Sequence, residues 1–192
     1  MDEENQTEIL QEIRDPGGKL LKTITMKDGI PNGPMVIYDE NGKVSGKLNY
    51  DNGILSGPAE FFLSEKPLML TFFENGLQEG ESILFSNGIK VGVANYRCGV
   101  LEGAFTSFDN EGNVIRIAIY AGGSQNGECQ TFYPDGTLME QAVYKSNLPD
   151  GQVIKYFPNG NVMEVSTFQE GKPYGYVDTY DADGDLKSRR EV

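Results

Sequence analysis

The sequence contains no histidine and no tryptophan, and it has only two cysteines. The absence of histidine removes the commonest general base and metal ligand of enzymes. No stretch approaches the roughly 18 apolar residues that cross a membrane as a helix. The opening segment MDEENQTEIL has neither the basic nor the apolar region of a signal peptide. We therefore expect a cytoplasmic protein without catalytic residues, metal or cofactor; an upstream signal would instead place it in the envelope or outside the cell.

Positive charge is also scarce, since 16 lysines and arginines face 29 aspartates and glutamates, for a net charge of -13. An acidic surface repels phosphate backbones and anionic lipid heads, so we expect neither nucleic acid nor membrane as a partner. The charge is compatible with a basic protein partner, and it would also keep a single open sheet soluble. Both interpretations stay open, and the oligomeric state is not indicated.

The two cysteines, Cys98 and Cys129, are predicted to lie about three strands apart. At the usual strand spacing this is roughly 14 Å, which is too far for a disulfide. Reduced thiols agree with a cytosolic location.

Glycine is abundant, and it recurs at steps of 23 or 24 residues. The anchor glycines of this repeat are Gly33, Gly57, Gly80, Gly103, Gly127, Gly151 and Gly175. Five residues after each anchor stands an aromatic: Tyr38, Phe62, Phe85, Phe108, Phe132, Tyr156 and Tyr180. Seven residues before the later anchors stands another: Tyr50, Phe73, Tyr96, Tyr120, Tyr144 and Phe168. A fixed period of this length is the signature of a repeat architecture.

The position four residues before each anchor is glycine in every unit except one, where it is Asn147. Asparagine is the non-glycine residue that best tolerates a left-handed backbone, so we predict positive φ throughout this column. Segments of about seven residues, rich in Val, Ile, Thr, Tyr and Phe, lie between Asn-Gly or Asp-Gly pairs, the strongest short-range hairpin signal. We predict an all-β fold: an elongated antiparallel β-meander of about seven to eight tandem hairpin repeats.

The repeats divide the chain into a disordered acidic tail, residues 1–8, and a single repeat array, residues 9–192. Within the array, residues 9–32 form a degenerate unit that fits a polar N-terminal cap. Residues 57–75 are irregular, because Pro67 cannot donate a ladder hydrogen bond, and a bulge or distorted hairpin is expected there. DADGDL at 181–186 occupies an ordinary turn position, so we interpret it as a turn rather than a calcium loop.

The two aromatic columns are expected to form the packed face of the sheet. Tyr133 and Phe157 lie outside these columns, directly after a column residue, and should point to the opposite face. We hypothesise that Tyr133, Phe157 and Tyr176 form a protein-binding patch, because exposed aromatics are typical interface anchors. A second small core on that face is the alternative, and it stays open.

The units DGQVIKYFPNGNVMEVSTFQEGKPYG and NGECQTFYPDGTLMEQAVYKSNLPDG resemble the MORN repeat variant, in which G-x4-Y-[YF]-x-[ND]-G-x-[LV] is followed by an aromatic and G-K-x2-G. Bacterial proteins of this kind are often labelled as YwqK-type antitoxins. The resemblance covers the chain from about Ile9 to Val192 and implies an antiparallel β-array that acts through protein contacts. The segments Glu65-Lys66-Pro67 and the missing G-K after Tyr144 depart from the pattern.

We therefore expect a non-enzymatic protein-interaction repeat, such as an antitoxin, an immunity protein or a scaffold. The alternative is an extended surface that binds polysaccharide or cell-envelope material. An enzyme would need a grouped set of carboxylates or hydroxyl groups outside the turns, and the sequence shows none.

Overall fold

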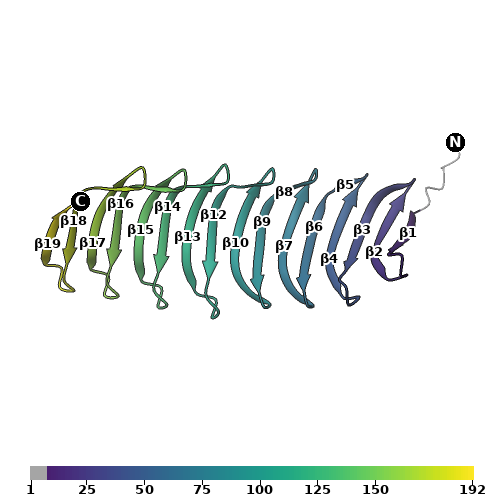
Figure 1. Cartoon of the computed structure of the whole chain (residues 1–192), viewed down its shortest axis with the longest axis horizontal. Helices are drawn as coiled ribbons and strands as arrows, with labels where there is room; N and C mark the ends of the chain where they lie inside the picture. Colours follow the sequence, from purple (N-terminus) through teal and green to yellow (C-terminus); the bar gives the residue numbers. More distant parts are fainter. Residues whose placement is uncertain (1–7) are drawn as a thin grey trace. The chain divides into compact units, whose positions relative to one another are not determined.

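A computed structural model describes residues 8–192, and every regular element in that range is a β-strand (Figure 1). The expected acidic tail lies outside the described residues, except for Glu8, which begins the first strand. The chain falls into two compact units, one reaching to Ile89 and including Tyr96–Gly99, the other made of Lys90–Asn95 and Val100–Val192. No helix among the described residues is long and apolar enough to cross a membrane.

The first unit holds β1 (Glu8–Arg14), β2 (Leu20–Lys27), β3 (Ile30–Tyr38), β4 (Val44–Asp51), β5 (Ile54–Leu55), β6 (Gly57–Leu63), β7 (Lys66–Glu74), β8 (Leu77–Gln78) and β9 (Gly80–Ser86). Strand β10 (Ile89–Arg97) contributes residues to both units. The second unit holds β11 (Val100–Leu101), β12 (Gly103–Phe108), β13 (Val114–Ala121), β14 (Ser124–Phe132), β15 (Leu138–Lys145), β16 (Leu148–Tyr156), β17 (Val162–Gln169), β18 (Lys172–Tyr180) and β19 (Leu186–Glu191). Successive strands pair antiparallel within each unit, which confirms the predicted all-β meander of hairpins.

Short two-residue turns join one hairpin to the next, and both of their residues have positive φ. Asn52 and Gly53, for example, have φ of 46° and 85°, as a type I′ turn requires. Asn147 fills the glycine position of its turn with φ of 68°, so the predicted left-handed column is confirmed. From Gly53 onward, the second residue of the turn also donates its N–H to a carbonyl of the preceding hairpin, as Gly53 does to Pro31 at 2.7 Å.

A longer turn closes most hairpins, and aspartate stands at the start of most of these turns. The Oδ1 atom of Asp39 accepts the N–H groups of Asn41 and Lys43 at 2.9 Å each. Asp109 and Asp181 do the same in their turns. These bonds satisfy backbone donors that the tight turn leaves without a ladder partner. The segment DADGDL is therefore such a turn, as predicted.

In each unit a stripe of buried residues, most of them small, runs along the centre of one sheet face, and we call it the buried stripe. In the first unit it comprises Ile24, Met35, Ala59, Thr71 and Ser82; in the second, Ala94, Ala118, Cys129, Ala142, Val153 and Ser166. In the second unit, Ala142 lies directly between Cys129 and Val153 on the neighbouring strands. Tyr144 lies two residues after Ala142 on β15 and therefore on the same face, beside the stripe. Large side chains such as this one shield the small residues of the stripe from water, although the sheet is a single layer.

The two aromatic columns lie on opposite faces of the sheet, which corrects the expectation of one packed face. Tyr144 shares the face of Ala142, because the two residues are two positions apart on β15. Tyr156 lies three positions after Val153, the partner of Ala142, and so points to the other face. The physical reason is strand register: from β14 to β16, paired residues are an odd number apart, as Cys129 with Ala142 and Ala142 with Val153 are, so the inward positions switch between even and odd numbers.

The hairpins at 57–75 and 80–97 differ from the others in their turns, and in the second of them Asn87 and Gly88, with φ of 53° and 84°, form a two-residue loop. Ser64 and Glu65, with φ of 50° and 67°, make a tight two-residue loop in place of the longer one. A register shift does lie between Phe61 and Phe62, as expected, but an equivalent shift closes the other hairpins too. The irregularity is therefore a shortened loop on an otherwise regular pair of strands, with Pro67 paired opposite Phe62. Both thiols are free; Cys98 is exposed and Cys129 is buried.

Candidate functional site

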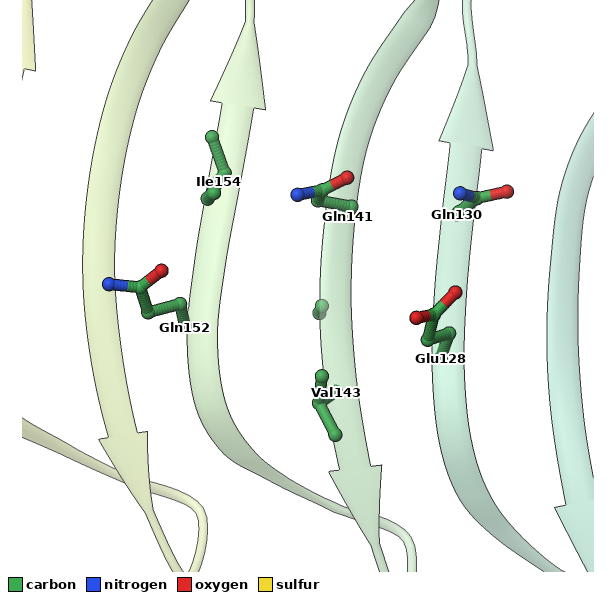
Figure 2. A pocket seen from close by; sticks show the side chains of 7 residues that line it. Glu128, Gln130, Gln141, Val143, Gln152 and Ile154 are labelled. Atoms are coloured by element: carbon green, nitrogen blue, oxygen red, sulfur yellow. The ribbon is translucent and has the colours of Figure 1, made fainter.

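The face opposite the buried stripe carries a shallow pocket across three strands of the second unit. Glu128 and Gln130 project from β14, Gln141 and Val143 from β15, and Gln152 and Ile154 from β16 (Figure 2). We call these six residues the amide face. The pocket they line, together with Ala142, has a volume of about 340 Å³.

Strand register brings the amide face together. Gln141 lies directly opposite both Gln130 on β14 and Ile154 on β16, and Glu128 lies opposite Val143. Cross-strand partners have Cβ atoms about 5 Å apart, so these side chains are neighbours. They alternate with the buried Cys129, Ala142 and Val153, which explains why they point away from the stripe.

The chemistry of this face suits recognition rather than catalysis. Each glutamine amide offers two N–H donors and a carbonyl acceptor, and Glu128 adds a negative charge. Within the described range, no hydrogen bond from another protein group engages the amides of Gln130, Gln141 and Gln152. Val143, which is 44% exposed, supplies apolar surface between them. Unused hydrogen-bonding groups beside exposed apolar surface are what a binding pocket presents to a polar ligand.

A second polar cluster lies on the stripe face around Arg116. Its Nε donates to the sulfur of Cys129 at 3.3 Å and its Nη2 to Gln125 Oε1 at 3.0 Å. Gln125 is 7% exposed, and its Nε2 atom is buried with no hydrogen-bond partner in residues 8–192. Burial, then the neighbouring thiol of Cys129, raises the pKa of Tyr144. This cluster ties adjacent strands together.

An exposed apolar ridge follows the short turns. Its members are Ile30, Ile54 and Leu77 in the first unit and Val100 and Leu148 in the second, each between 42% and 50% exposed. Each packs against the left-handed glycine of the following turn: Ile30 Cγ2 would lie 3.0 Å from a Cβ atom at Gly53. Where that glycine is replaced by Asn147, the ridge residue is the small Ser124. The side-chain oxygen of Asn147 then accepts the N–H of Gln125 at 2.7 Å.

The structure brings together two of the three aromatics predicted as a binding patch. Tyr133 and Phe157 open the longer turns of successive hairpins, in the column that aspartate occupies elsewhere. The hydroxyl of Tyr133 donates to the carbonyl of Tyr156 at 2.7 Å, so this side chain also joins the two hairpins. Both residues are half-buried.

Tyr176 lies apart from this pair. It is near the start of β18, four residues before Tyr180, which occupies the column of Tyr156. At the usual rise per strand residue that is about 13 Å from the turn. Tyr176 is 53% exposed and stacks with the guanidinium of Arg189 at 5.6 Å. The hypothesis of a single patch therefore stays a prediction for Tyr133 and Phe157, with Tyr176 as a separate exposed aromatic.

Sequence reasoning missed the amide face. The signal was present, because Gln130, Gln141 and Gln152 are spaced by 11 residues. Finding it required knowing that the inward positions change between odd and even numbers from β14 to β15 and again from β15 to β16. With that rule, the three glutamines fall on one face of three successive strands.

Comparison with known proteins identifies part of the repeat. A family model described as the MORN repeat variant matches residues 31–52, 125–146 and 149–170. The second and third matches contain all six residues of the amide face. A search of curated proteins gave no match.

Proposed function

The chain carries repeats of the MORN variant, and from this premise we propose that it is a non-enzymatic binding protein whose amide face holds a basic protein partner. Repeats of this family generally serve interactions with proteins or ligands. The observation that carries the proposal is the set of three glutamine amides without internal hydrogen bonds around a pocket of about 340 Å³.

Charge supports a basic partner. Glu128 is the one charged residue among those that line the pocket, and it is negative. The whole chain carries a net charge of -13. Such a field attracts cationic surfaces and accelerates their association at low salt. The same field opposes nucleic acid and anionic membranes, so neither is part of this proposal.

A binding protein of this kind could neutralise a toxin, as an antitoxin or immunity protein does, or serve as a scaffold. These roles share the same physical act, which is capture of a protein by an exposed sheet face. An antitoxin or immunity protein abolishes an activity of the protein it captures, whereas a scaffold does not. The partner, rather than this chain, decides which role applies.

A second candidate is a polysaccharide or another cell-envelope ligand. It is favoured by the aromatic rings that share the amide face, since Phe132 follows Gln130 by two positions and Tyr156 follows Ile154 by two. Amides beside aromatic rings can bind the hydroxyl groups and the apolar face of a sugar.

The test is affinity capture from the native lysate with the tagged full chain and two variants. One variant replaces the glutamines of the amide face (Q130A, Q141A and Q152A), and the other is the Tyr133→Ala and Phe157→Ala double variant. Circular dichroism checks that each variant is folded. We expect one stoichiometric basic protein, lost in the glutamine variant.

Loss only in the aromatic double variant would move the binding surface to the longer turns. If the folded wild-type chain captured no protein, the protein-binding proposal would fail. Binding on a glycan array that the glutamine variant abolishes would then support the second candidate.

A further inference from the structure

The first and last described strands each have one open edge. In residues 8–192, β1 pairs with β2 and with no other strand, and β19 pairs with β18 and with no other strand (Figure 1). An open edge presents unpaired N–H and C=O groups that can accept a further strand. Ile9 and Leu10 on β1 are 59% and 65% exposed. With Met26 and Gly29 they line a pocket of about 660 Å³.

The two edges differ in charge. Strand β1 carries Glu8 and Glu12 against Arg14, whereas β19 carries Lys187, Arg189 and Arg190 against Glu191. Pairing two β1 edges would bring acidic residues together, and pairing two β19 edges would bring basic residues together. Like charges on neighbouring strands are destabilising, and opposite charges are favourable. The charges therefore favour contact between unlike edges.

The repeat also supplies a register for that contact. Strand β19 is the counterpart of β17 one unit later, so Arg189 stands where Val165 does. Strand β1 is the counterpart of β18, because Arg14 and Tyr180 both precede the longer turn and pair in the same way with Leu20 and Leu186. Every β17-like strand inside the array is followed by a β18-like strand, as β17 and β18 show.

This register puts opposite charges face to face. In the β17–β18 pair, Val165 lies opposite Asp178. The same register would place Arg189 of one copy opposite Glu12 of the next, and both side chains are about half exposed. Glu12 now contacts Arg14, and Arg189 contacts Asp178. The new pair would extend these contacts into a cross-strand series of alternating charges.

We propose that β19 of one copy pairs with β1 of a second copy, in the register of β17 with β18. The contact is head-to-tail, so each added copy leaves another open edge and the association continues beyond a dimer. It also covers the exposed Ile9 and Leu10. The proposal is independent of the amide face and of any partner bound there.

Sedimentation velocity of the full chain at low ionic strength tests the proposal, because salt screens exposed charge pairs. We expect a concentration-dependent series of oligomers. E12K and R189E should each weaken the association at least about tenfold, since each puts like charges opposite one another. E111K, which makes the same change of net charge as E12K but in an exposed turn, should leave it unchanged.

Mixing the two single variants gives the sharpest result. Arg189→Glu supplies an acidic β19 edge that fits the β1 edge of Glu12→Lys, and the other two edges keep the wild-type Arg189 and Glu12. The mixture should therefore regain the open series, with the two variants alternating, although each variant alone associates weakly. The double variant in one chain should regain the whole series. A wild-type chain that stays monomeric, or an association that neither single variant weakens, would overturn the proposal.

Discussion

Replacing Gly53 with alanine measures how closely one hairpin packs on the next. Gly53 has φ of 85°, and a Cβ atom there would lie 3.0 Å from Ile30 Cγ2. Gly18 offers a matched control, because its φ is also 85° and nothing lies within 4 Å of its Cβ position. Both substitutions strain the backbone equally, so only the change at Gly53 also crowds a neighbouring side chain.

The magnitudes follow from these two terms. A Cβ atom on a left-handed backbone costs about 1–2 kcal/mol, which is the expected loss of stability for Gly18→Ala. Pushing Ile30 off its rotamer adds about 1 kcal/mol for Gly53→Ala. In a chain of this size, that extra destabilisation corresponds to a melting temperature lower by about 2–4 °C. Any gain from a stiffer unfolded chain is common to both variants and cancels in the comparison.

Urea unfolding followed by circular dichroism gives the free energies, and Ile30→Ala completes a double-mutant cycle. In the Ile30→Ala background, Gly53→Ala should cost only as much as Gly18→Ala does in the wild type. Equal costs for the two glycine variants in the wild-type background would refute the idea that the apolar ridge packs on the turns.

Three further substitutions test other contacts. Tyr133→Phe removes the hydroxyl that donates to Tyr156 and should lower the free energy of unfolding by about 1 kcal/mol, measured in urea; no change would mean that water replaces the bond. The side-chain amide of Asn113, then backbone N–H groups of the turn, lowers the pKa of Asp109. Its contribution to stability is complete above the ordinary aspartate pKa and is lost as pH falls through the lower folded-state pKa. A carboxyl NMR titration should show that pKa rising in Asn113→Ala, and an unchanged value would contradict the assignment. Ala118→Leu overfills a fully buried position of the stripe and should destabilise the chain by about 1–3 kcal/mol in thermal unfolding, whereas an unaffected melting temperature would show that the stripe has spare room.

Much of the fold was predictable because each turn has strict backbone requirements. Asn147 in a glycine column was sufficient to predict positive φ, and its φ of 68° confirms it. Glycine spacing and strand composition together specified the antiparallel hairpins. The shortened loop at Ser64 and Glu65 was harder to see, because neither residue is a usual choice for a left-handed backbone. Its prediction as a distorted region reflected the presence of Pro67.

The candidate site was less predictable than the fold. Tyr133 and Phe157 were chosen because they depart from the aromatic columns, and the structure does place them in adjacent turns. What the spacing did not reveal is that aspartate fills their column elsewhere as a turn-forming residue, as Asp39 and Asp109 show. The amide face depends on strand register, and register follows from turn length rather than from the identity of any one glutamine.

The bond from each short turn to the hairpin before it has a consequence for how such chains can change in length. The Gly53 N–H finds its acceptor on Pro31, and the Gly171 N–H finds its own on Pro149, by the same backbone geometry. If one whole repeat is duplicated or lost, the backbone N–H of each short turn therefore still finds an equivalent carbonyl acceptor on the hairpin before it. Ser124 and Asn147 are the exception, because the turn that has asparagine in place of glycine follows a repeat with a small serine at the ridge position, and the Asn147 side chain accepts the N–H of Gln125. A recombination event between them would separate a matched pair and place asparagine against a bulky neighbour.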